Sequence, residues 1–388
     1  FLRQQLELQQ PDLRFPDTYT VAAAEWLERA QINWKQEWRD EQGKAVPWNG
    51  QWLHWSSRDQ HLEEADPCPV ELFKSIQEAR SPKKLGAPPI YYVILKLDGD
   101  DLGGWLRGEK SPVVREIMHP DLVAYYDQLG DTSKAGLDAR RPVGPALHAA
   151  ISSALSNFAL NAVPTIVARH HGTTVYSGGD DALVLLPTSS ALACASELRQ
   201  AYSADWYTRE EHDYLMMGSR ATISGGMVVV HAKDDLRLAL QDARASEEAA
   251  KHAGKDALCI RVRRRSGEHT SAICSWAFVT TVSSWMTQFR AGASDRWAYH
   301  LYAQRSALNR LPVLAMQAEI RRQINRSDEP TPTLIPADKL AHAFDQIRNE
   351  VVSTPAGDRL RFGTAGAALD SFLTLCQTAS FLARGRDQ

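Results

Sequence analysis

The feature that most constrains this chain is the apolar run IYYVILKLDGDD at residues 90–101, which ends in a group of acidic residues. The run is rich in β-branched and aromatic residues, and its length suits a single buried strand. Its last residues bring Asp98, Asp100 and Asp101 to the strand's end. The pattern therefore predicts a buried strand whose end opens into a polar site.

The segments that follow predict the rest of a fold. A loop-and-helix insertion and an apolar helix lead to GTTVYSGGDDALVLLP at residues 172–187, which reads as a hairpin with Gly178, Gly179, Asp180 and Asp181 at its tip. A helix, a strand, a helix and a final strand come next. This order indicates an α+β fold, a ferredoxin-like nucleotidyl cyclase or polymerase palm with an antiparallel sheet backed by helices on one face, flanked by helical domains.

Composition divides the chain into three predicted domains. Residues 1–89 form a Trp-rich, mainly helical segment, residues 90–266 the GGDD palm, and residues 267–388 a C-terminal helical domain. Helices are expected within the last domain at 272–290, 307–324 and 336–352. The tryptophans are interpreted as packing residues, because basic residues do not surround them as a groove for single-stranded nucleic acid requires.

Overall composition excludes several classes of protein. The 388 residues are 44% apolar and carry a net charge of -3, which excludes disorder as the main state. No apolar stretch is long enough to predict a membrane span, and no signal peptide is visible. Five separated cysteines without a CxxC pair support neither a zinc ribbon nor a disulfide framework, which favours a reducing, cytoplasmic compartment. Because the chain starts at Phe1, we expect a fragment of something longer.

Two acidic clusters are the candidate chemical centre. In a ferredoxin-like sheet the first strand and the hairpin are central neighbours, so Asp98, Asp100, Asp101, Asp180 and Asp181 should converge. Such carboxylates would repel one another without a cation, and they are the hard oxygen ligands that Mg²⁺ or Mn²⁺ prefers. Gly178 and Gly179 would permit a tight turn and the close approach of a nucleotide. The alternative is an ordinary exposed turn, which the paired DGDD motif disfavours.

The ordered motifs resemble a known family. IYYVILKLDGDDLGGWL, the block ending in VYSGGDDALVLLP, and ATISGGMVVVH leading into EEAAKHAGKDALCIRVRRR look like the large subunit of type III CRISPR effector complexes, of the Cmr type. The resemblance implies an enzyme that joins ATP into cyclic oligoadenylates when its complex, with other protein subunits and guide RNA, binds target RNA. The family's N-terminal nuclease domain and first palm are not visible in these residues.

The resemblance also implies roles for single residues. Asp98, Asp180 and Asp181 would be catalytic metal ligands, with Asp100 in the metal set and the Gly99 carbonyl as an extra ligand. A two-metal site of this kind activates the attacking hydroxyl and holds the triphosphate.

Four further residues are candidates for binding the nucleotide. Lys251 and Lys255 match basic positions that related cyclase palms place near phosphates, although a solvated helix end is the alternative. Ser177 and Ser224 flank glycine pairs, so each is either a hydrogen-bond donor to a nucleotide or a turn residue.

Two other functions remain open. A diguanylate cyclase would share the palm, but Asp181 is followed by Ala182 instead of the Glu-Phe of that family, and the RHHG before the hairpin lacks its RxxD pattern. A non-catalytic scaffold could dock small subunits and guide RNA through the helical flanks. The preference for adenine rests on the resemblance alone.

Overall fold

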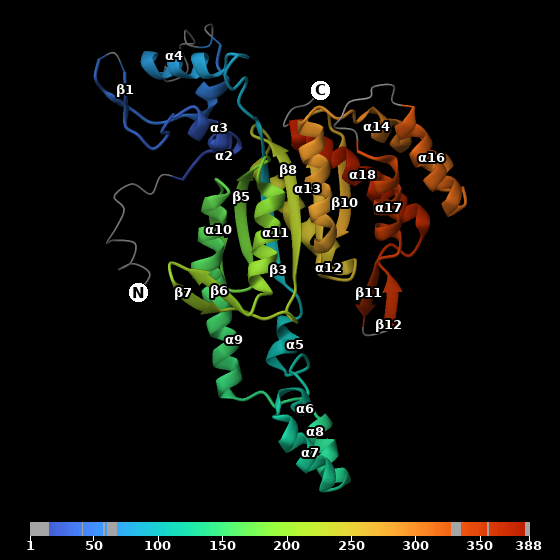
Figure 1. Ribbon diagram of the computed structural model, residues 1–388. Helices are drawn as coiled ribbons and strands as arrows, with labels where there is room; N and C mark the ends of the chain where they lie inside the picture. The colour runs from blue at the N-terminus through green and yellow to red at the C-terminus, as the bar shows by residue number, and fades with distance from the viewer. Residues whose placement is uncertain are drawn as a thin grey trace.

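The computed structural model describes residues 15–40, 42–56, 59, 68–326, 335–354 and 357–384. A six-stranded sheet lies at the centre of this part of the chain (Figure 1). In sheet order, its strands are β10 (His269–Ser275), β9 (Ala257–Arg263), β8 (Ile223–His231), β3 (Tyr91–Gly99), β5 (Ala182–Pro187) and β4 (Thr173–Ser177).

Five of these strands, all except β10, lie within the predicted palm. The order β8-β3-β5-β4 places the first strand, β3, between β8 and the hairpin, as in a ferredoxin-like sheet, and all three pairings are antiparallel. Leu97 pairs with Ala182 on one side, and Asp98 pairs with Ser224 on the other. The α+β palm, with β3 and the hairpin as central neighbours, is confirmed.

The sheet continues beyond the predicted final strand. β9 runs parallel to β8, and β10 runs antiparallel to β9. Residues 272–275 were expected to be helical, and this expectation is wrong, because helix α13 (Trp276–Arg290) begins only after β10. Thr270, Ala272 and Cys274 alternate inward with a period of two, but this short signal precedes a longer helical pattern.

Helices cover both faces of the sheet, so the expectation of helices on one face is wrong. Tyr91, Val93 and Leu95 lie in one hydrophobic cluster, whereas Tyr92 and Ile94 lie in another, so β3 is apolar on both sides. The first cluster is completed by α10 (Val163–Arg169), α11 (Ala191–Tyr202), α13 and α18 (Ala365–Arg384). The second is completed by α2 (Thr18–Ala22) and α12 (Leu236–His252).

One helix has membrane-like length and composition. In the described part of the chain, α9 (Pro145–Asn157), the π-helical turn η3 (Phe158–Ala162) and α10 form a run, Pro145–Arg169, apolar enough to cross a membrane. However, 44% of its most apolar window is buried inside the protein. Phe158, Val163 and Ile166 contribute to the core beside the sheet, which is typical of a core helix.

The N-terminal segment has its own small core. Trp26 and Trp52 are buried there with Leu72 and Ile76, and Trp34, Trp38, Trp48 and Trp55 pack against them. The interpretation of the tryptophans as packing residues is confirmed. The elements of this segment after α2 are α3 (Ala24–Arg29), β1 (Trp38–Arg39), β2 (Ala45–Val46), η1 (Gly50–His54) and α4 (Val70–Ala79).

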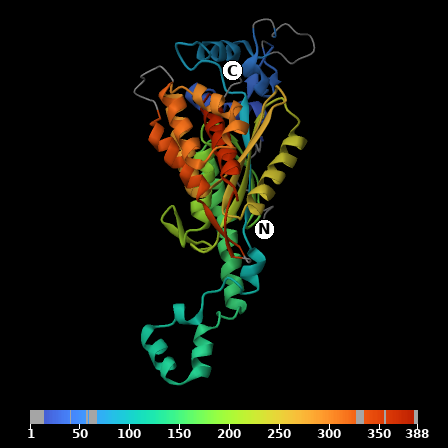
Figure 2. The same cartoon turned by 90° about the vertical axis from the view of Figure 1, so that its right-hand side faces the viewer.

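The predicted insertion after β3 forms an arm that extends away from the sheet (Figures 1 and 2). It consists of α5 (Leu102–Leu106), α6 (Val114–Ile117), α7 (Pro120–Gln128) and α8 (Asp131–Asp138). A separate hairpin, β6 (Trp206–Arg209) and β7 (His212–Leu215), lies beside α9.

The C-terminal segment packs directly on the palm. Its elements after α13 are α14 (Arg296–Ala303), α15 (Arg305–Leu308), α16 (Val313–Asn325), α17 (Ala337–Arg348), β11 (Val351–Thr354), β12 (Gly357–Leu360) and α18. The ring of Phe381 in α18 lies 4.9 Å from that of Tyr91 in β3. The division at residue 266 stays a prediction, but the segments on its two sides share one hydrophobic cluster.

Candidate functional site

The end of β3 and the hairpin tip lie in direct contact. The Gly99 amide donates a hydrogen bond of 3.0 Å to the carbonyl oxygen of Asp180. A Cβ atom at Gly99 would lie 2.8 Å from Asp180 Cβ and 2.6 Å from Tyr202 Oη, which is too close for any side chain. Glycine is therefore required here, and its place in the predicted site follows from this close approach.

The hairpin tip is built as its glycines predict. Gly178 donates a hydrogen bond of 3.0 Å to the Asp181 carbonyl, and Gly179 has φ +95°, a conformation that favours glycine. Among the described atoms, Ser177 Oγ and Asp181 Oδ1 are buried without a hydrogen-bond partner. Such groups are costly to leave unpaired, so the tip is better suited to a bound ligand than an ordinary exposed turn would be.

The electrostatics of the tip favour a cation. Burial raises the pKa of the Asp180 carboxyl, and the carboxylates of Asp98 and Asp181 raise it further. A backbone hydrogen bond and the Lys251 ammonium offset only part of this effect on the pKa. Burial and the same acidic neighbourhood also hold the pKa of Tyr202, beside Gly99, well above its usual range. The predicted repulsion between the two clusters is therefore present in the structure.

Lys251 reaches this cluster from helix α12. Its ammonium forms ion pairs with Asp98 and, at 2.9 Å, with Glu247 one helical turn earlier in α12. Burial alone would lower the pKa of Lys251, but these two carboxylates raise it overall. Glu247 is itself buried and lies 3.5 Å from Lys96. The predicted lysine is thus at the site, and it neutralises Asp98.

The position of α12 depends on a second glycine. A Cβ atom at Gly226 in β8 would lie 2.3 Å from the Ala243 carbonyl oxygen and 2.4 Å from the Glu247 amide nitrogen. Because both atoms belong to the helix backbone, only glycine lets α12 lie this close to the sheet. This close packing brings Lys251 to Asp98.

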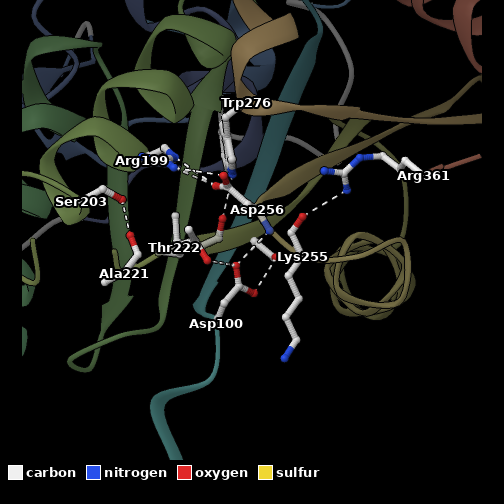
Figure 3. A network of polar contacts seen from close by, with 11 residues as sticks. Asp100, Arg199, Ser203, Ala221, Thr222, Lys255, Asp256, Trp276 and Arg361 are labelled. Atoms are coloured by element: carbon white, nitrogen blue, oxygen red, sulfur yellow. Dashed lines mark hydrogen bonds and ion pairs between the residues drawn. The ribbon is translucent and has the colours of Figure 1, made fainter. Parts of the chain in front are cut away.

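Asp100 is held inside the protein. It is 4% exposed and accepts hydrogen bonds from Thr222 Oγ1 at 2.8 Å, Ser224 Oγ at 2.7 Å and the Asp256 amide at 3.0 Å (Figure 3). These donors occupy both of its oxygens and favour a structural role. Ser224 is fully buried and donates to Asp100, so its hydroxyl is committed to that bond.

Asp101 and Lys255 form a second, more exposed pair. Asp101 adopts the left-handed conformation with φ 58°, and its carboxylate pairs with Lys255 and, at 3.4 Å, with Lys110. The hydrogen bond from Lys255 holds the pKa of Asp101 below its usual range. Lys255 therefore lies at the same end of β3 as Lys251, as the family resemblance implies.

The described residues contain no group of three or more His, Cys, Asp or Glu side chains close enough to form a ready metal site. The residues nonetheless suit a divalent cation, because the carboxylates of Asp98 and Asp181 are near enough to raise the pKa of Asp180, and Asp181 Oδ1 has no partner among the described atoms. The ligand set Asp98, Asp180 and Asp181, with Asp100 and the Gly99 carbonyl, stays a prediction.

The sequence interpretation missed several residues that build the site. Glu247 precedes Lys251 by four residues, a spacing that indicates an ion pair on one helix face. Thr222 supports Asp100, and Arg199 binds the Asp256 carboxylate through contacts of 2.9 and 3.1 Å. These partners lie far apart in the sequence, which gives no local signal for their pairing.

Comparisons with known proteins find relatives of the palm region. Residues 91–259 match the family described as Cas10/Cmr2, second palm domain. A CRISPR system Cmr subunit Cmr2 of Pyrococcus furiosus is 31% identical over 226 residues, covering 56% of this chain and 24% of that protein. The Cmr2 subunit of Saccharolobus solfataricus is 39% identical over 66 residues, which are 17% of this chain and 6% of the relative.

Two solved structures share the fold. A chain of the type III-B Cmr-beta complex in its apo state aligns with a TM-score of 0.61 and 14% identity over 99% of this chain and 48% of its own length. A chain of the type III-B Cmr-beta complex bound to cognate target RNA aligns with a TM-score of 0.55 and 14% identity, over 86% of this chain and 45% of its own length. This chain thus spans less than half of the length of each of these four proteins.

Proposed function

We propose that this chain joins ATP molecules into cyclic oligoadenylates, because residues 91–259 match the second palm domain of the Cas10/Cmr2 family. It would do so as part of the large subunit of a type III-B CRISPR complex. Its partners would be other protein subunits, guide RNA and target RNA, and its location cytoplasmic. The relatives that suggest these partners are themselves Cmr subunits and Cmr-beta complexes.

The observation that carries the proposal is the contact between Gly99 and Asp180. It joins the two acidic motifs at one edge of the palm, with Lys251 and Lys255 beside them. Phosphoryl transfer depends mainly on positioning and charge stabilisation, and this arrangement offers anionic ligands for a metal and cations for phosphates.

Each residue then has a distinct role. Asp98, Asp180 and Asp181 would hold Mg²⁺ or Mn²⁺, which when bound would neutralise phosphate charge and activate the attacking ribose hydroxyl. Lys251 would exchange its pairing with Asp98 for the triphosphate, since a lysine is a mobile point charge. Of the glycines, Gly179 would leave room for the nucleotide, because a Cβ atom there would meet only Leu155 at 3.8 Å, whereas Asp180 and Tyr202 fill the space beside Gly99 and Tyr176 fills the space beside Gly178. Ser177 Oγ, buried without a described partner, could donate to the nucleotide.

A scaffold role is the second candidate, and one observation favours it. Lys251 already neutralises Asp98, so the site can persist without a metal. A subunit that only docks other proteins and RNA would keep this closed arrangement.

Nucleotide binding distinguishes the two candidates. With Mn²⁺ present, we expect the assembled complex to bind ATP more tightly than GTP, and Lys251→Ala to weaken ATP binding roughly ten- to hundredfold, the loss expected for one charge-assisted contact. Lys134→Ala, on the exposed arm, is the matched control and should bind ATP as the parent does. Equal ATP affinity of the parent and Lys251→Ala would show that Lys251 does not bind the triphosphate. A preference for GTP would favour the diguanylate cyclase alternative.

A further inference from the structure

The loop between α12 and β9 has an unusual backbone. Gly254, Lys255 and Asp256 follow one another with φ values of 114°, 63° and 45°. Non-glycine residues adopt positive φ at an energetic cost, and they keep it only where the surroundings hold them. Lys255 lies within this loop, and the amides of Gly254 and Lys255 donate to the carbonyl oxygen of Lys251, each at 3.2 Å, at the end of α12. The loop's conformation therefore holds the backbone that carries both lysines.

A buried arginine from the C-terminal segment holds the loop. Arg361 follows β12, is only 7% exposed, and donates from Nη1 to the carbonyl oxygens of Ala253 at 3.2 Å and Lys255 at 3.1 Å. Figure 3 shows Arg361 reaching the backbone beside Lys255. Its Nε lies 2.9 Å from Glu350, which sits just before β11. The guanidinium fork thus ties the loop to the β11–β12 hairpin.

Three other contacts hold this loop. Val352 of β11 fills the space beside Gly254, where a Cβ atom would lie 2.7 Å from its side chain. On the opposite side, Asp100 accepts the Asp256 amide and Arg199 binds the Asp256 carboxylate. The loop is therefore fixed between the palm and the C-terminal segment, which lies about a hundred residues further along the chain.

We infer that Arg361 is a positioning residue of the nucleotide site: through the Ala253 and Lys255 carbonyls it fixes Lys251 and Lys255 against Asp98 and Asp101, where the phosphates of ATP would bind. This inference rests on the proposed function. It gives the C-terminal segment a direct mechanical connection to the site, although no residue of that segment is expected to touch the nucleotide.

The test compares two neighbouring variants in the assembled complex. Arg361→Met removes the contacts to both carbonyls, whereas Glu350→Gln removes only the ion pair and leaves those contacts in place. Both variants disturb the same buried pair, so a merely structural role predicts similar effects on nucleotide binding. The readouts are the Kd of ATP with Mn²⁺, the KM and kcat of product formation, and the thermal unfolding midpoint.

We expect Arg361→Met to raise the Kd and KM for ATP about tenfold, as one weakened charge-assisted contact would, with a smaller change in kcat. Glu350→Gln should bind ATP as the parent does. Equal Kd values for the parent and Arg361→Met, or equal weakening in both variants, would overturn the inference. If the parent binds ATP but forms no cyclic product, the proposed function fails while the Kd comparison still tests Arg361.

Discussion

Gly99 shows how single residues define this site. It is the point where β3 touches the hairpin tip, and neither Asp180 nor Tyr202 leaves room for a side chain there. The same close contact removes part of the water around Asp180 and lets the charge of Asp98 raise the pKa of Asp180. Geometry and electrostatics at this position therefore have one cause, the direct contact between the two acidic motifs.

The raised pKa of Asp180 leads to a pH-dependent prediction for stability. A carboxyl whose pKa is higher in the folded state stabilises the fold below its ordinary pKa of 3.8, and this contribution is lost as the pH rises through the folded value. At neutral pH the charged Asp180 therefore destabilises the metal-free protein. We expect Asp180→Asn to unfold at a higher temperature than the parent at neutral pH, with the difference vanishing in acid.

Thermal unfolding in the presence of a chelator, repeated from acid to neutral pH, checks this prediction. Asp121→Asn is the control, because Asp121 lies exposed on the arm and should show no such pH-dependent gain. A neutral-pH midpoint for Asp180→Asn at or below that of the parent would contradict the electrostatic account.

Sequence reasoning at this scale located the acidic motifs and their glycines from local patterns, and both lysines from the family resemblance. It did not separate Asp100 from its neighbours. Thr222 and Ser224 donate hydrogen bonds to Asp100 from more than a hundred positions away in the sequence. The sequence alone does not distinguish an aspartate with such buried donors from an exposed one. Only the fold shows that Asp100 is buried.

At the scale of elements, the packing of α12 on β8 delivers Lys251 to the site. Gly225 and Gly226 are adjacent in β8 and face opposite sides of the sheet. A Cβ atom at Gly225 would meet the flexible side chains of Leu97 and Leu258 at 2.9 Å, whereas one at Gly226 would meet the α12 backbone at 2.3 Å. The two glycines therefore offer a matched comparison.

We expect Gly226→Ala to push α12 from the sheet, to lower the free energy of unfolding by about 1–3 kcal/mol, and to weaken ATP binding because Lys251 moves with the helix. Gly225→Ala should disturb packing but leave ATP affinity closer to that of the parent. Denaturant unfolding and nucleotide titration measure the two effects. ATP affinity that falls more in Gly225→Ala than in Gly226→Ala would show that α12 does not position the lysine.

Prediction of the elements succeeded where a periodic pattern was long. β3, the hairpin, α12 and β9 fall where their patterns indicate. β10 was missed because its seven residues adjoin the strongly helical α13, and the β11–β12 hairpin was missed because Val351 and Val352 continue the pattern of α17. Short edge elements take their conformation from partners that no local pattern reveals.

At the scale of the whole molecule, the palm and the C-terminal segment share one hydrophobic core. Tyr91 of the first palm strand contacts Phe381 of the last helix, and β10 joins the sheet from beyond residue 266. By contrast, the arm contributes no buried residue to the clusters around the sheet. Composition distinguishes these segments along the sequence, but it does not show which of them share a core.

A chain that ends after Ser266 should therefore fail to fold cooperatively, because it loses β10, α13 and α18 and exposes the apolar face of β9. Replacing residues 109–142 with a Gly-Ser linker is the control. Gly108 and Val143 already lie in contact, so the linker can close, and we expect an unfolding midpoint near that of the parent. Thermal unfolding followed by circular dichroism distinguishes the two, and a cooperative transition in the truncated chain would contradict the shared core.

The central claim is that the contact between Gly99 and Asp180 marks a site of nucleotide joining. Mass spectrometry of products tests it most directly, using the chain within its complete large subunit and complex, supplied with ATP, Mg²⁺ and target RNA. The account predicts cyclic oligoadenylates from the parent and from the arm control Asp121→Asn, and none from Asp180→Asn/Asp181→Asn. An assembled parent that forms no adenylate product, or a double variant that forms as much as the parent, would contradict it.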